Sequence, residues 1–168
     1  MGENRNDQHA IGGSPQGSLV EAGLFRATGV VYDAVLSEDR RYRYCLSRSW
    51  GRGERMAWIM LNPSTADADV DDPTIRRCRS FAKAWGYGGL EVVNLFAYRA
   101  TNPAALRLHG EAAIGPDNDA VIVKATFTAG IIIAAWGEKG RLLGRDASVL
   151  ALLRRFYDGS IYCLGTTV

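Results

Sequence analysis

Ala57-Trp58-Ile59-Met60-Leu61-Asn62-Pro63-Ser64-Thr65-Ala66-Asp67 joins an unbroken apolar run of five residues to a polar turn. An apolar run of this length is typical of a strand that is buried on both faces, and parallel sheets contain such strands. In open parallel sheets, ligands bind beyond the carboxyl ends of the strands, which is where residues 62–72 would project. The stretch therefore predicts a parallel sheet and places a candidate site at one edge of it.

The composition fits one domain with one core. Of the 168 residues, 47% are hydrophobic, which is enough for one good core. The 20 basic and 18 acidic residues give a net charge of +2, so the overall charge neither requires nor excludes a polyanionic partner. The N-terminus has no apolar signal segment, and no run approaches the roughly 20 apolar residues that cross a bilayer. We expect a cytoplasmic protein that makes no contact with a membrane.

The elements expected along the chain alternate between strands and helices. Residues 1–23 lack any periodicity and predict a flexible tail, and residues 24–168 predict a single domain. Two strands at 27–36 and 42–49 predict a hairpin that pairs at one edge of the sheet or packs over one end. After the hairpin we expect strands at 57–61, 90–96, 131–135 and 161–164, and helices at 73–85, 103–108, 116–127 and 145–156. This order predicts an α/β fold of three layers, αβα, with a central, mainly parallel four-stranded sheet.

The cysteines do not form a metal site. The three of them, Cys45, Cys78 and Cys163, lie far apart, each inside an apolar segment. No pair has the spacing of metal ligands, so we expect buried small hydrophobic side chains in a reducing compartment. The sequence predicts neither a resident metal nor another cofactor.

The acidic residues after the central strand resemble the start of a calcium loop. Aspartates alternate at positions 67, 69 and 71, but the sixth position of such a loop lacks glycine and Cys78 stands where glutamate is needed. Asp72, followed by Pro73, instead has the pattern of a helix N-cap. Asp67 remains a candidate general base or magnesium ligand.

Motifs follow each of the expected strand ends, and they carry a family resemblance. They are Leu61-Asn62-Pro63-Ser64-Thr65-Ala66-Asp67, Asp72-Pro73-Thr74-Ile75-Arg76-Arg77-Cys78, Val93-Asn94-Leu95-Phe96-Ala97-Tyr98-Arg99-Ala100-Thr101 and Trp136-Gly137. From about Tyr32 to its last residue, the chain is similar to the bacterial and phage domain-of-unknown-function family 1643. The name of that family supplies no reaction.

The order of these strand ends is more distantly similar to the uracil-DNA glycosylase superfamily. This resemblance implies a glycosylase-like fold in which Asn62 positions the attacking water and Asn94 reads the edge of a flipped base. The superfamily's His-Pro loop, which stabilises the departing base anion, has no counterpart, because no histidine follows His109. We therefore expect that the domain is truncated at its C-terminus.

The two asparagines each have a structural alternative. Asn62 either satisfies backbone groups of the turn before Pro63 or holds a water through its neutral amide. Asn94 either caps the edge of the sheet or pairs with adjacent donor and acceptor atoms of a nucleobase.

The neighbouring residues are candidates for binding a substrate. Pro63, Ser64 and Thr65 form a turn that could hold a phosphate, although Ser64 has no histidine partner for a nucleophilic triad. Tyr98 or Phe96 could stack on a base, with core packing as the alternative for Phe96. Trp136 either lines the pocket or plugs the sheet. The residues of this candidate site are Asn62, Pro63, Ser64, Thr65, Asp67, Asn94, Phe96, Tyr98, Arg99 and Trp136.

A row of cations could bind a nucleic-acid backbone. Arg76, Arg79 and Lys83 share one face of the expected helix 73–85. Such a row is either a solvated surface or, together with Arg99, a track for phosphates.

These observations favour a glycosylase-like domain that binds a nucleic acid or nucleotide and hydrolyses an N-glycosidic bond. One alternative is a non-catalytic module that binds nucleic acid or nucleotide. Another is a metal-dependent phosphoesterase that uses Asp67.

Overall fold

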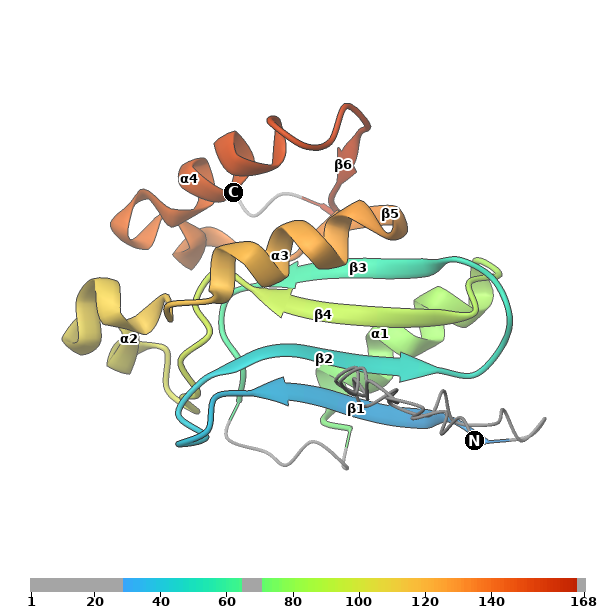
Figure 1. The fold of residues 1–168 in the computed structure, drawn as a ribbon, viewed down its shortest axis with the longest axis horizontal. Helices are drawn as coiled ribbons and strands as arrows, with labels where there is room; N and C mark the ends of the chain where they lie inside the picture. The colour runs from blue at the N-terminus through green and yellow to red at the C-terminus, as the bar shows by residue number, and fades with distance from the viewer. Residues whose placement is uncertain (1–28, 65–70, 166–168) are drawn as a thin grey trace, which may run out of the picture.

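The structure is a computed structural model that describes residues 29–64 and 71–165, and its centre is a six-stranded mixed sheet (Figure 1). The strands are β1 (Val31–Leu36), β2 (Arg43–Ser49), β3 (Arg55–Met60), β4 (Gly89–Asn94), β5 (Ala129–Ala134) and β6 (Ile161–Tyr162). Their order in the sheet is β1-β2-β4-β3-β5-β6. The last four strands in this order are mutually parallel, and β2 is antiparallel to both β1 and β4.

The α/β class is therefore confirmed, but the predicted sheet was too small. The hairpin of β1 and β2 takes the first of its two predicted places, at one edge of the sheet: β2 pairs with β4 over the register Leu46↔Val92 to Ser49↔Gly89, which makes the sheet six-stranded and mixed rather than four-stranded. The physical reason is that a four-stranded parallel sheet would leave the backbone N–H and C=O groups on the outer edge of β4 unpaired. Alternating apolar residues predict the hairpin but do not reveal which edge it completes.

In the described residues, four α-helices and two 3₁₀ helices connect the strands. They are α1 (Pro73–Ala84), α2 (Ala104–His109), η1 (Gly110–Ala113), α3 (Asn118–Phe127), η2 (Glu138–Gly144) and α4 (Arg145–Leu153). The start of α1 is as predicted, because the Asp72 side chain accepts a hydrogen bond from the Ile75 amide at 2.8 Å and Pro73 takes the first helical position. The two 3₁₀ helices were not predicted, because single turns leave no periodicity in the sequence.

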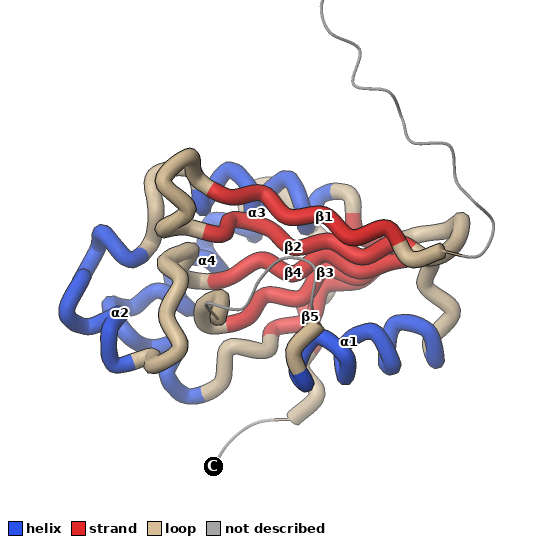
Figure 2. Tube along the Cα trace, turned by 90° about the horizontal axis from the view of Figure 1, so that it is seen from below, coloured by secondary structure: helices blue, strands red, loops and turns tan. Residues whose placement is uncertain are grey.

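The two faces of the sheet carry separate hydrophobic clusters. Along β3, Met56 and Trp58 pack toward α1, whereas the alternate residues Ala57 and Ile59 pack toward α3 and α4. Figures 1 and 2 show α1 and α3 on opposite sides of the strands. Because β3 is buried on both faces, its unbroken apolar run is explained.

Two successive connections carry the chain to the two neighbours of β3 in the sheet. The chain passes from β3 through α1 to β4 on one side, and from β4 through α3 to β5 on the other side of β3. Where consecutive connections run to opposite faces, the segments that follow the strands diverge and leave a crevice at the carboxyl edge. In this sheet that position lies between β3 and β5.

A buried carboxylate joins the hairpin to α1. The Nε atom of Arg48, a β2 residue with no exposed surface, lies 2.8 Å from Oδ1 of Asp71, and Arg79 of α1 binds the other oxygen of that carboxylate. Arg76 donates a hydrogen bond to the Asp71 backbone oxygen at 2.7 Å. Burial raises the pKa of Asp71, but the hydrogen bonds from Arg79 and Arg48 outweigh it, and the net pKa is lowered. Asp71 is therefore ionised at neutral pH.

We expect Asp71→Asn to destabilise the protein by on the order of 3 kcal/mol at pH 7, because it removes the carboxylate that pairs with the buried Arg48 charge. The pKa of Asp71 is lower in the folded than in the unfolded chain, so its contribution is complete above about pH 4 and is lost as the pH falls through the folded value. Urea denaturation of both proteins at pH 7 and pH 3 measures this: the difference between them should shrink in acid.

The matched control is Asp39→Asn, which removes an ion pair with Arg41 at the exposed tip of the hairpin. That variant should unfold close to the wild type at pH 7, because solvent screens an exposed pair. Equal destabilisation by the two variants would contradict the central role of Asp71.

Candidate functional site at the carboxyl edge of the sheet

A cavity of about 810 Å³ opens at the position between β3 and β5. Its walls come from the residue that follows β3, from α2 and the segment before it, and from η2 after β5. The lining is apolar at Leu61, Leu106 and Leu142 and cationic at Arg107 and Lys139. A concave site of this size, with a few charged groups on apolar walls, is typical of a small-molecule pocket.

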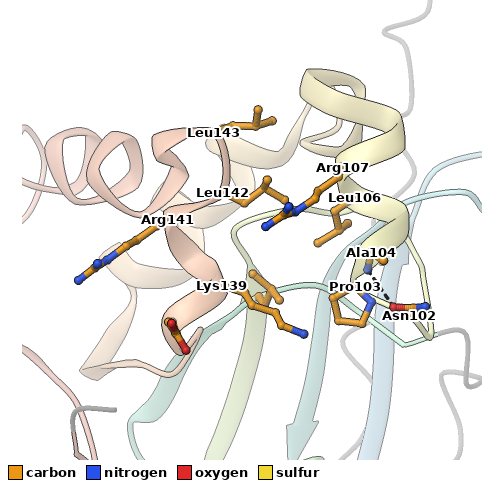
Figure 3. A pocket seen from close by; sticks show the side chains of 11 residues that line it. Asn102, Pro103, Ala104, Leu106, Arg107, Lys139, Arg141, Leu142 and Leu143 are labelled. Atoms are coloured by element: carbon orange, nitrogen blue, oxygen red, sulfur yellow. Dashed lines mark hydrogen bonds between the residues drawn. The ribbon is translucent and has the colours of Figure 1, made fainter. Parts of the chain in front are cut away.

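The cations of the cavity come from two different elements. In Figure 3 the side chains of Arg107, from α2, and Lys139, from η2, extend into the space between these helices, whereas Arg141 extends away from it. Arg107 and Lys139 are both exposed to solvent. An anion in the cavity would therefore meet positive charge from both walls, although the Glu138 carboxylate also lines the η2 wall.

Asn62 lies beside the cavity but does not line it. Its Nδ2 atom donates hydrogen bonds to the backbone oxygens of Pro63 at 3.1 Å and Ala100 at 2.8 Å. The Ala100 amide in turn donates to the Pro63 oxygen at 3.0 Å. Asn62 thus joins the segment after β3 to the segment after β4, and since both Nδ2 hydrogens are used, a water could only donate to its Oδ1 atom.

Asn94 ends β4 directly beside β3, since it pairs with Met60 in the register. The residue is 1% exposed and its Nδ2 atom has no hydrogen-bond partner. Its backbone oxygen accepts a hydrogen bond from Nδ2 of Asn118 at 2.9 Å, and Arg145 donates to the next carbonyl, that of Leu95, at 2.8 Å. Side chains of α3 and α4 therefore donate hydrogen bonds to the backbone oxygens where β4 ends, whereas the Nδ2 atom of Asn94 has no hydrogen-bond partner.

The other predicted substrate contacts lie in different surroundings. Phe96 is fully buried in the cluster beneath α3, and Trp136 packs against the same cluster. Tyr98 is half-buried, with its ring centroid 4.1 Å from that of His109. The Ser64 hydroxyl donates to Oδ2 of Asp72 at 3.4 Å. The structure thus places Phe96 in the core and the partly buried Trp136 against it, and leaves Ser64 and Tyr98 at the edge.

The cations of the predicted phosphate track differ in their surroundings. Arg79 is engaged by Asp71 and also donates to the hydroxyl of Tyr32 at 3.2 Å. Lys83 lies over the ring of Trp50, 5.4 Å from its centroid. Arg99 is partly buried at the carboxyl edge and donates to the Arg40 backbone oxygen at 3.1 Å. Of the three helix cations, Arg79 is therefore engaged by an ion pair, whereas Arg76 and Lys83 remain exposed to solvent.

Two predicted site residues, Thr65 and Asp67, lie outside the described residues. In the parts of the chain that the structure does describe, no group of three or more histidine, cysteine or acidic side chains has the arrangement of a metal site. Within the same limits, no helix has the length and apolarity that crossing a membrane requires. Cys45 and Cys78 are buried, and burial raises the pKa of each thiol to about 12. Cys163 is exposed, contrary to prediction, because β6 ends at Tyr162.

A β-bulge in the hairpin directs Arg43 to the carboxyl edge of the parallel strands. Val35 pairs with Cys45 and Leu36 pairs with Arg43, so Tyr44 is an extra residue on β2. A bulge reverses which face the following side chain points to. It brings Arg43, whose amide donates to the Ala97 oxygen at 2.9 Å, to the side of the sheet that α1 covers.

Arg43 is only 5% exposed, and its Nε atom is covered without a hydrogen-bond partner. The charged groups around it are Arg99, Asp72 and Arg48. Burial, and then the charge of Arg99, lower the pKa of Arg43 to about 10, so the guanidinium still carries its charge at neutral pH. A buried charge without an ion pair to a described residue is costly, by several kcal/mol on the order-of-magnitude scale for single ions.

The comparisons with known proteins identify a family and no activity. Residues 43–168 match the model described as "Protein of unknown function (DUF1643)". The chain belongs to this family. Searches of curated proteins and of solved structures found no significant match. For this family member, the chemistry of the site must therefore be inferred from its own residues.

Sequence reasoning about this DUF1643 chain did not single out Arg43, Arg107 or Lys139. A signal existed for two of them, since Arg107 and Lys139 lie in segments that follow β4 and β5, where the rule for parallel sheets places ligands. No signal existed for Arg43, because its burial depends on a bulge in strand pairing.

We expect Asn62→Asp to destabilise this family member by about 2 kcal/mol, because aspartate has no N–H to donate and its carboxylate would face the Pro63 and Ala100 oxygens. The matched control is Asn102→Asp, since Asn102 accepts from the Ala104 amide at 2.9 Å through Oδ1, which aspartate retains. Thermal unfolding measures both. A loss at position 102 equal to that at position 62 would contradict the bridging role of Asn62.

Proposed function

We propose that the protein binds a nucleotide, free or as a unit of a nucleic acid, in the cavity between α2 and η2. The observation that carries this proposal is the cavity itself, because it lies at the carboxyl edge where the connections diverge and receives cations from two walls. Its volume of about 810 Å³ is within the range for ligands of nucleotide size.

The chemistry of the walls suits the two ends of such a ligand. Leu61, Leu106 and Leu142 offer apolar surface to a base or sugar, while Arg107 and Lys139 offer charge to a phosphate. Hydrogen bonds between a cationic side chain and a phosphate are about twice as strong as those between neutral groups. Arg107 can form two such bonds in parallel, whereas Lys139 acts as a point charge.

Titration calorimetry with AMP, ADP and ATP at low ionic strength tests this proposal. We expect saturable binding that weakens as salt is added, because solvent ions screen exposed charges. Arg107→Ala and Lys139→Ala should each lower the affinity by about tenfold. Arg141→Ala is the matched control, since this cation borders the cavity but extends away from it, and its affinity should remain near that of the wild type. Absence of saturable binding, or an unaltered affinity in the double variant, would overturn the proposal.

Hydrolysis of an N-glycosidic bond is a second candidate, favoured by Asn94. Its amide nitrogen is buried and has no partner, beside the strand that leads to Asn62. An asparagine amide can pair with one edge of a nucleobase, and Asn62 can still accept a hydrogen bond from a water. This reaction requires that the segments around Asn94 separate when a base enters, because the residue is 1% exposed.

Incubation with DNA containing uracil, hypoxanthine or a mismatch, followed by detection of abasic sites, tests the second candidate. We expect abasic sites with the wild type and a loss of at least about tenfold in rate with Asn94→Leu, which cannot pair with a base edge. The same variant should retain AMP binding in the cavity. If none of the substrates is cleaved, hydrolysis is rejected while nucleotide binding is not.

A further inference from the structure

One residue of the cavity carries the opposite charge to the others. Glu138 lines the same cavity as Arg107, Lys139 and Arg141. It opens η2 and is exposed to solvent. None of the ion pairs among the described residues joins this carboxylate to the cations of the cavity. A ligand made only of negative groups would be attracted by the cations and repelled by Glu138, so the charge pattern suits a ligand that also presents hydrogen-bond donors.

The core holds the wall that bears this carboxylate in place. The turn begins at Gly137, whose φ of 66° is in the left-handed region, and the Gly140 amide donates to the Gly137 oxygen at 3.1 Å. Gly140 is buried, and a methyl group at its position would overlap the indole of Trp136, which itself packs against the core cluster beneath α3. Successive residues of a 3₁₀ turn are about 120° apart, so Glu138 and Lys139 point in other directions than Gly140. The fold thus turns Gly140 toward the core and leaves Glu138 and Lys139 to line the cavity.

The chemistry of a carboxylate limits what Glu138 can bind. An ionised carboxylate only accepts hydrogen bonds, so its partner in a ligand must be a hydroxyl or an amine. A nucleotide offers hydroxyls on its sugar. In nucleotide-binding α/β folds, an acidic side chain recognises the 2′-hydroxyl of ribose in this way.

The position of Glu138 favours the sugar over the base. Lys139 follows it directly in sequence, so their Cα atoms are about 3.8 Å apart. In a nucleotide the sugar is bonded to the phosphate, whereas the base is one group further away. When Lys139 holds the phosphate, the sugar is therefore the part nearest to Glu138, and the base is left for the apolar surface of Leu61, Leu106 and Leu142.

We propose that Glu138 makes the cavity selective for ribonucleotides over deoxyribonucleotides, because its carboxylate accepts hydrogen bonds from the ribose hydroxyls. This inference rests on the nucleotide binding proposed above and adds the identity of the sugar. The ribonucleotide is either free or a unit of RNA, since both carry the 2′-hydroxyl.

Titration calorimetry of the wild type with AMP and 2′-deoxy-AMP tests this selectivity. We expect AMP to bind at least about tenfold more tightly, because the hydrogen bond from its 2′-hydroxyl goes to a charged acceptor. In Glu138→Ala the affinity for AMP should fall by at least about tenfold, and the difference between the two nucleotides should disappear. Glu138→Gln keeps an acceptor oxygen without the charge and should give an intermediate preference.

Inorganic phosphate separates recognition of the sugar from repulsion between charges. It has no sugar, so its affinity should rise or stay unchanged in Glu138→Ala, because the substitution removes a negative charge from the cavity. The same variant should therefore bind AMP more weakly and phosphate no more weakly, which a loss of folded protein does not explain. The matched control is Glu111→Ala, since Glu111 is exposed but does not line the cavity, and this variant should keep the wild-type preference for AMP.

Single-stranded RNA and DNA oligomers of the same sequence distinguish the two sources of the ribonucleotide. If the source is RNA, the RNA oligomer binds more tightly than the DNA oligomer, and Glu138→Ala removes the difference. If the source is a free ribonucleotide, neither oligomer displaces AMP.

Two results would overturn the role of Glu138 and leave nucleotide binding in place. One is equal affinity of the wild type for AMP and 2′-deoxy-AMP, and the other is an equal change for both nucleotides in Glu138→Ala. If the wild type binds neither nucleotide, both proposals are rejected.

Discussion

The ion pairs of the buried Asp71 carboxylate are the interaction on which the packing of α1 against the hairpin depends. The carboxylate neutralises Arg48 near the end of β2 and Arg79 on α1, and it immediately precedes the residue that caps α1. One acidic group therefore fixes the hairpin, the first turn of α1 and the position of two cations. Since ion pairing in a low-dielectric interior requires close geometry, this contact sets the distance between elements that are far apart in sequence. The charge it does not reach is that of Arg43.

Positive charge lies at two places along one edge of the sheet. The cavity with Arg107 and Lys139 lies between β3 and β5, and Arg43 lies beyond β4 on the hairpin strand. The segments after β3 and β4 run between them and are joined by the hydrogen bonds of Asn62. Membership of DUF1643 supplies no reaction, so the charge of the cavity is the strongest physical indication of what the protein recognises. It is the basis of our proposal that the protein binds ligands that carry phosphate.

The sequence predicted the region of the site better than the residues in it. An apolar strand followed by Asn62 and Pro63 located the carboxyl edge, because parallel strands expose ligand-binding loops there. The role of each side chain could not be read in this way. Asn62 donates to the backbone oxygens of Pro63 and the distant Ala100, Phe96 is buried in the core, and Arg79 binds Asp71, eight residues away. The residue type determines which hydrogen bonds and ion pairs a side chain can form, but only the fold determines which partner lies close enough.

What the sequence determined by itself is local: the unbroken run that becomes β3, the Asp72-Pro73 start of α1, and the alternation of strands and helices that makes an α/β fold. These follow from backbone geometry and from the periodicity of apolar residues, which act over a few neighbouring positions. The tertiary structure decided that the hairpin completes the outer edge of β4, that a bulge turns Arg43 inward, and that α2 and η2 enclose a cavity. Each of these depends on how distant segments pair and pack, for which no short stretch of sequence contains the information.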